Sequence, residues 1–189
     1  MSKKIVLRNV RLSYEHIFNP SKFDETQERA KYSATLIIPK NHPDLPALKK
    51  ALTEAGAEKF PTAFTGGAWP RGYSCALKDA DNDTDREGTP LCEKNPEYTG
   101  CYVLRADSTS RPIVLDRRKA AVTEEDGLIY SGCYINVSMS AAGFEFGKMT
   151  KGVKCYLNGV QFVKDDERFG GDASSDFDSL DGEDDDFMA

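Results

Sequence analysis

Aromatic and basic side chains alternate in one part of the chain that is rich in glycine and proline. The candidates there are Trp69, Arg71, Tyr73 and Lys78. Cationic side chains can follow the phosphates of an unpaired nucleic-acid strand, and flat rings can stack on its bases. Loops run over the surface of a protein, so a tryptophan in this setting is an unusual core residue. Two interpretations stay open: contact with nucleic acid, or a loop anchored in the core.

A second group of rings and lysines follows the most regular strand pattern of the chain. Phe144, Phe146 and Lys148 have the same parity, so an extended chain places them on one face. Lys151 and Lys154 come directly after them. The pattern is typical of a hairpin at the mouth of a small barrel, where it would contact nucleic acid. The alternative is that one or both phenylalanines cap the core.

Tyr134 stands at the start of that regular strand, on its polar face with Asn136 and Ser138. An outward tyrosine is a natural platform for a base, because its ring is apolar and its hydroxyl is polar. The same position would also suit an ordinary surface tyrosine. Three further basic residues are candidates for phosphate contact, with a solvated surface as the alternative: Lys31, Arg105 and Arg111.

The acidic run at residues 79–87 is the one candidate for metal chemistry. Its acids Asp79, Asp81, Asp83 and Asp85 suggest, as an alternative function, a metal-dependent nuclease or phosphotransferase. Catalytic carboxylates are held on rigid elements, however, and these lie in one loop. Neither possible EF-hand register places a glutamate at the twelfth position of the loop. We therefore expect a protein that is not an enzyme and needs neither metal nor cofactor.

Cysteine usage and hydropathy indicate the compartment. Five cysteines lie apart in the sequence without a C-x-x-C pair, which favours free thiols in a reducing compartment over a zinc site or disulfides. No apolar run approaches the roughly 20 residues of a membrane helix. No signal-peptide pattern follows Met1. We expect a cytoplasmic protein that does not contact a membrane.

Hydrophobic periodicity predicts a mainly β fold. About five principal strands, separated by turn signals and interrupted by one helix, indicate a small barrel or a sandwich. One helix inserted between the strands favours an OB-fold-type five-stranded barrel with long loops, a common platform for single strands. The expected strands span residues 4–14, 30–38, 100–106, 111–116, 132–141 and 152–163, and the expected helix spans residues 44–60.

The charge is unevenly distributed along the chain. Residues 172–189 contain eight acids and no lysine or arginine. Taking these eight from the totals of 25 basic and 31 acidic residues leaves the preceding part at +2, although the whole chain is at −6. This asymmetry favours a polyanion partner for the body and an interaction role for the tail. The expected organisation is a folded domain over residues 1–170 and a disordered acidic tail over 171–189.

Several segments resemble a family of single-stranded-DNA-binding proteins from tailed phages. The resemblance implies an OB fold, sequence-tolerant binding of single-stranded DNA, a role in phage DNA replication or recombination, and a location in the host cytoplasm. It also makes the acids around Asp79 part of a family loop. The similar segments, which follow the family order, are residues 11–14, 31–39, 77–81, 96–100, 111–116, 130–134, 151–153 and 157–161.

The end of the chain resembles the acidic tails of bacterial and phage single-strand binders. Such tails finish in acids and a hydrophobic residue that dock replication or recombination proteins. The matching residues here are Asp184, Asp185, Asp186 and Phe187. The chain continues to Met188 and Ala189, so its terminal carboxylate does not belong to the phenylalanine. A chaperone-like protein that acts through its tail is a further alternative.

Overall fold

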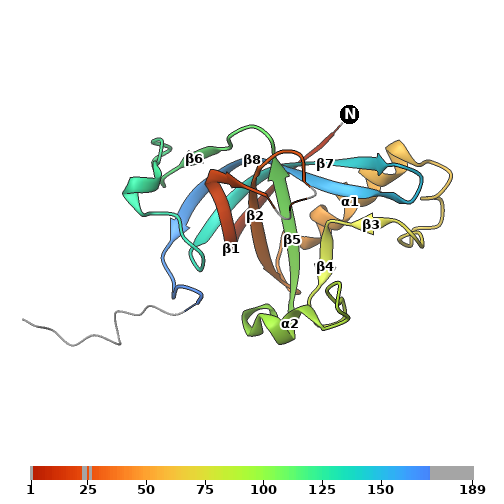
Figure 1. The fold of residues 1–189 in the computed structure, drawn as a ribbon, viewed down its shortest axis with the longest axis horizontal. Coiled ribbons are helices and arrows are strands. Elements are labelled where there is room, and N and C mark those ends of the chain that lie inside the picture. Colours follow the sequence, from red (N-terminus) through yellow and green to blue (C-terminus); the bar gives the residue numbers. More distant parts are fainter. Residues whose placement is uncertain (1, 23–24, 26, 171–189) are drawn as a thin grey trace, which may run out of the picture.

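The computed structural model describes residues 2–22, 25 and 27–170 (Figure 1). Strands dominate this part of the chain, as the sequence predicts. The helices are α1 (Leu45–Lys59) and the short α2 (Leu91–Lys94). The strands are β1 (Lys3–Ser21), β2 (Lys31–Pro39), β3 (Ser74–Cys75), β4 (Leu77–Asp79), β5 (Cys101–Ser108), β6 (Ile113–Leu115), β7 (Tyr134–Phe146) and β8 (Thr150–Lys164).

Five long strands close into a ring. β1 pairs antiparallel with β2 and with β7, β2 pairs antiparallel with β5, and β7 pairs antiparallel with β8. The ring closes where β5 runs parallel to β8, through the pairs Ala106–Cys155 and Asp107–Tyr156. The mainly β, OB-type fold class predicted from the sequence is confirmed.

Three short strands complete the edges of this ring. β3 pairs with β8 and β4 pairs with β5, so the segment between them fills the gap where β5 and β8 separate. β6 runs parallel to β8, and its other edge is covered by the Leu115–Ala121 bridge and by the bond from the Val122 N–H to the Val114 carbonyl at 3.0 Å. Figure 1 shows β6 and α1 at opposite ends of the molecule.

Alternating side chains fill the ring. Ile135, Val137 and Met139 of β7 point inward and are almost fully buried, as their spacing predicts. α1 adds Leu48 and Leu52 from one stripe of its surface, because residues four apart lie on the same side of a helix. The helix ends at Lys59, just before Pro61, which cannot continue it.

β1 is longer than the sequence predicts. It runs through the Asn19-Pro20 turn signal to Ser21, because its second half pairs with β2 as far as Ser21–Lys31. A bulge between Leu7 and Val10 explains the drifting parity of its apolar residues. Long-range strand pairing therefore overrides a local turn preference here.

The segment between β4 and β5 folds over part of the outer face of the ring. Ile37, Ala80, Tyr98 and Val103 form a second buried cluster under α2. The Tyr98 hydroxyl lies 3.0 Å from the Ser13 Oγ and ties this cap to β1. The cap covers the Ile37 and Val103 positions, whereas Arg105, further along β5, is exposed.

Gly152 allows the closest approach between two strands. A Cβ at this position would lie 2.1 Å from the Ser74 carbonyl oxygen of β3. Gly152→Ala should therefore push β3 away and lower the free energy of unfolding by about 1–3 kcal/mol, the usual cost of overpacking. Urea unfolding measures the change. Gly66→Ala, where a Cβ meets nothing within 4 Å, is the matched control. Equal stability of the two variants would contradict this account.

Candidate nucleic-acid interface

One continuous surface crosses the outer faces of β2, β4, β5, β7 and β8. Leu104 and Ala106 point into the core, so Arg105 between them points outward. The strand register places Ser33, Asp107, Tyr156 and Ser140 in one row across four strands. We call this surface the β5–β8 strip, and its basic and aromatic members are Lys31, Lys78, Arg105, Phe144, Lys154 and Tyr156.

A lysine covers the rings of the strip. Lys154 Nζ lies 4.6 Å from the centre of the Tyr156 ring and 5.9 Å from that of Phe144. Tyr156 remains 36% exposed. A cation over partly exposed rings is suited to single strands, because the lysine can reach a phosphate while the ring accepts a base. The sequence analysis missed Tyr156, although the alternation of Lys154, Tyr156 and Asn158 along β8 places it outward.

The cations of the strip differ in how far they are neutralised. Lys31 pairs with Asp107 at 3.8 Å across β2 and β5. Lys78 and Lys154 have no carboxylate partner among the residues that the structure describes. Lys78 is exposed on β4, beside Val103 of β5. The strip therefore carries local positive charge that the nearly neutral body does not reveal.

The loop before β3 is held by an aromatic cluster. Trp69 Nε1 donates to the Tyr73 carbonyl at 2.7 Å, and the Trp69 ring meets Phe64 edge-to-face at 5.1 Å. Phe64 in turn lies against Gly56 of α1. Trp69 is half-buried against the core, so its contacts favour the anchoring interpretation, and base stacking by Trp69 stays a prediction. Arg71 is exposed in this loop.

The β7–β8 hairpin carries the second predicted group of rings and lysines. Phe146 is 81% exposed and therefore does not cap the core, while Phe144 is half-buried on the strip. Lys148 is exposed at the turn. Lys151 Nζ lies 4.5 Å from the centre of the Tyr73 ring, which joins the hairpin to the aromatic loop.

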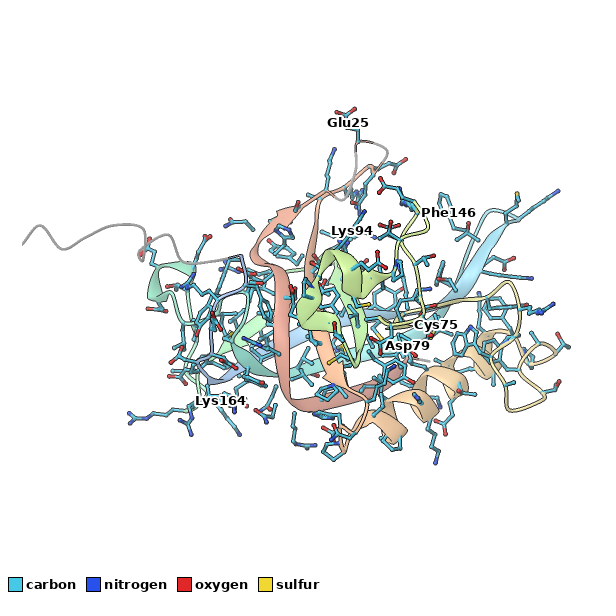
Figure 2. The ribbon with its side chains drawn as sticks, turned by 90° about the horizontal axis from the view of Figure 1, so that it is seen from below. Glu25, Cys75, Asp79, Lys94, Phe146 and Lys164 are labelled. Carbon is cyan, nitrogen blue, oxygen red and sulfur yellow. The ribbon has the colours of Figure 1, made fainter. Side chains whose placement is uncertain are left out.

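Tyr134 lies at the other end of β7. Figure 2 shows Lys164, which pairs with Tyr134, and Phe146 at opposite ends of the molecule. Lys164 Nζ stands 4.4 Å from the centre of the Tyr134 ring, and the Arg11 guanidinium lies 5.9 Å from it. The structure thus gathers part of the predicted set on the strip and leaves Tyr134 apart. Arg111 is exposed in the connection between β5 and β6.

The acidic run is occupied by internal partners. Lys40 Nζ lies 2.9 Å from Asp79 and 2.7 Å from Asp81. Hydrogen bonds from the Gly100 N–H and from Lys40 hold the pKa of the Asp81 carboxyl below its ordinary value. Lys94 and the Thr89 N–H do the same for the pKa of Asp85. No group of three or more His, Cys, Asp or Glu side chains within the described ranges could hold a metal ion.

The cysteines and helices add no further site. All five cysteines are free thiols, as predicted. Burial raises the pKa of Cys155 to about 12, so this thiol stays protonated at neutral pH. Across residues 2–22, 25 and 27–170, no helix has the length and apolar content needed to cross a membrane.

Comparison with known proteins decides the family. The family model described as Enterobacter phage Enc34, ssDNA-binding protein matches residues 3–188. The chain belongs to this family. The chain is also similar to protein p50 of Acyrthosiphon pisum secondary endosymbiont phage 1, at 33% identity over 185 residues and 94% of both chains. The resemblance inferred from the sequence is confirmed.

Solved structures of phage proteins share the fold. The ssDNA-binding protein of bacteriophage Enc34 in complex with ssDNA is 26% identical, with a TM-score of 0.69 over 88% of this chain and 89% of that chain. The gp2.5 protein of bacteriophage T7, a single-stranded-DNA-binding protein, has a TM-score of 0.60 at 15% identity, over 96% of this chain and 98% of that chain. The likeness to gp2.5 is one of fold.

Removing the central ring of the strip should weaken binding of single-stranded DNA. Tyr156→Ala should cost about 1–3 kcal/mol, the value of one stacked base, and should leave the thermal unfolding midpoint nearly unchanged because the side chain lies on the surface. Fluorescence anisotropy with labelled oligomers of increasing length measures the affinity.

Tyr134→Ala is the matched comparison, since it removes the same type of ring from the far end of β7. It should weaken binding by a similar amount only for oligomers long enough to extend beyond the strip. If Tyr156→Ala binds as tightly as the parent protein at every length, the strip is not the interface.

Proposed function

We propose that this protein binds single-stranded DNA with little preference for base sequence. The observation that carries this function is the β5–β8 strip, where Lys154 covers Tyr156 and Phe144 beside Arg105 and Lys78. Stacking accepts any base face, and phosphates carry no sequence information. α1 packs its apolar stripe against the ring, so it is not presented for reading a major groove.

Membership in the Enc34 family supports the same function. A family relative has been solved in complex with ssDNA, and the shared fold extends over most of both chains. We infer a role in phage DNA replication or recombination, where exposed single strands need to be covered. The residues proposed to contact DNA are those of the strip, together with Trp69, Arg71, Tyr73, Arg111, Tyr134, Phe146, Lys148 and Lys151.

We further propose that the acidic residues after Gly170 form a separate unit that competes with DNA. Arg11 fixes the start of this unit: its Nη2 donates to the Glu167 carbonyl at 2.9 Å, and its guanidinium lies 4.2 Å from the centre of the Phe169 ring. Residues 171–189 lie outside the described part of the chain. Because they are tethered to the body, their eight acids reach the basic strip at high effective concentration.

Release of this tail would make it available to other proteins. DNA phosphates and tail carboxylates compete for the same cations, so bound DNA displaces the tail. Asp184, Asp185, Asp186 and Phe187 are then free to dock a replication or recombination protein. Binding to DNA and recruitment of a partner are in this way coupled. We infer no catalytic role for Asp79–Asp85, because Lys40 and Lys94 pair with Asp79, Asp81 and Asp85, and Asp83 accepts the Asp79 N–H.

Preference for single strands tests the function directly. The protein should bind an unstructured oligomer much more tightly than the corresponding duplex at moderate salt, and similarly tightly for different mixed base compositions. Stacking needs unpaired bases, which a duplex does not offer. Competition of both DNA forms against one labelled oligomer gives the two affinities, with and without Mg²⁺ to detect cleavage. Equal affinity for duplex would contradict this proposal, and Mg²⁺-dependent cleavage would favour the nuclease alternative.

Deleting residues 172–189 should raise the affinity for single-stranded DNA at low ionic strength. The gain should shrink as salt rises, because salt screens the attraction between tail and strip. Affinity measured across a salt series gives both results. A full-length variant with the eight acids changed to Asn or Gln is the matched control for charge, and it should behave like the deletion. An unchanged affinity of the deletion at every salt concentration would rule out competition.

A further inference from the structure

An apolar hollow lies on the outer face of the ring, where β6 runs beside β8. Its volume is about 510 Å³, and its lining is mainly apolar. Val6 of β1 is 40% exposed and Ile113 of β6 is 65% exposed, which is unusual for side chains of this kind gathered at one place. Leu115 completes the apolar wall. The hollow adjoins the β5–β8 strip, because Asn158 on its rim follows Tyr156 on the outer side of β8.

Each of the three amide side chains around the hollow already donates a hydrogen bond within the protein. Asn136 Nδ2 donates to Gln161 Oε1 at 3.1 Å, and Gln161 Nε2 donates to the Asp116 carbonyl at 3.2 Å. Asn158 Nδ2 donates to Ser140 Oγ at 2.8 Å. Among the residues that the structure describes, no aromatic ring lines the hollow. A nucleobase would find neither a stacking platform nor unused amides there, so the hollow favours an apolar side chain.

The charge beside the hollow is positive. Lys4 is part of its lining, and no acid is. The turn that follows Leu115 carries three exposed basic residues, Arg117–Lys119. Asp116 Oδ1 holds this turn in place, because it accepts hydrogen bonds from the Arg118 N–H at 2.7 Å and from the Ala120 N–H at 2.8 Å. An occupant that combines an apolar side chain with acids next to it would match both features.

We propose that Phe187 of this chain's own tail occupies the hollow, with Asp184–Asp186 beside the basic turn. The tail supplies the required sequence, three acids followed by Phe187 and Met188. Its reach is sufficient, because the stretch from Gly170 to Phe187 can extend over about 55 Å. A phenylalanine side chain buries up to about 200 Å² of surface, which a hollow of this size can accept. This inference rests on the proposed competition between tail and DNA and gives the tail a defined docking place.

Docking of Phe187 in the hollow explains how one tail can both compete with DNA and recruit a partner protein. While Phe187 is in the hollow, the docked tail holds its negative charge on the body and opposes the approach of DNA phosphates to the adjoining strip, and Phe187 is hidden from partner proteins. When DNA occupies the strip, repulsion between phosphates and acids favours release of the tail. The aromatic residue is then exposed only on protein that has bound DNA.

Fluorine NMR on the full-length protein, without DNA, tests whether Phe187 docks in the hollow. A trifluoromethyl-phenylalanine at position 187 should give a fluorine NMR signal that is shifted and broadened relative to the denatured protein. Ile113→Asp, which adds negative charge and removes the apolar wall, should return the signal to the denatured position. Ala47→Asp on the exposed side of α1 adds the same charge away from the hollow and should leave the signal shifted. A signal that does not respond to Ile113→Asp would overturn the proposal.

Binding to single-stranded DNA at low salt provides the second measurement. Ile113→Asp and Phe187→Ala should each raise the affinity about three- to tenfold, since each weakens an intramolecular competitor, and the double variant should gain no more than either alone. Lower affinity in both Ile113→Asp and the uncharged Ile113→Ser would mean that the hollow takes DNA, and would overturn the proposal. If the tail deletion raises the affinity while Ile113→Asp and Phe187→Ala do not, Phe187 does not dock in the hollow, but the proposed competition between tail and DNA is still supported. If the deletion also has no effect, the competition fails as well.

Discussion

Closure of the ring between β5 and β8 is the constraint on which the other features depend. Only two residue pairs join these strands, yet they fix which side chains point inward. Because β5 is held beside β8, Arg105 of one strand and Tyr156 of the other come onto one outer surface. Without this pairing the cations and the rings would lie on separate edges of an open sheet. The candidate interface therefore follows from the topology of the ring rather than from any single motif.

The interior of the ring was predictable from sequence, and the surface only in part. The strict alternation of β7 identified Ile135, Val137 and Met139 as core residues, because one face of the strand meets no water. The same rule applied to β8 would have found Tyr156. The orientation of Trp69 could not be predicted in this way, because the direction of a side chain in a loop depends on contacts with distant parts of the chain. Trp69 packs on Phe64, and Phe64 in turn packs against Gly56 of α1. The extension of β1 beyond Pro20 likewise depends on its pairing with β2.

Local charge, rather than total charge, decides what each surface can bind. The acids at Asp79 and Asp81 are held by Lys40, and Asp85 is held by Lys94, so three carboxylates of the most acidic loop of the body are paired with lysines. On the strip, Lys154 lies over rings instead of a carboxylate. Patterns of charge in the sequence could not distinguish these two cases. The difference lies in which lysine the fold brings to which acid.

The short strands that cover the edges of the ring also affect how copies of the protein can contact one another. At high local concentration, long exposed sheet edges invite strand exchange and aggregation. Here the gap between β5 and β8 is filled by β3 and β4, and the outer edge of β6 is bonded to Val122. At the sheet's two ends this leaves, among the described strands, only the two-residue β3 and the three-residue β4 as edge strands. Two copies brought close together would therefore have little free strand edge at these places through which to exchange strands.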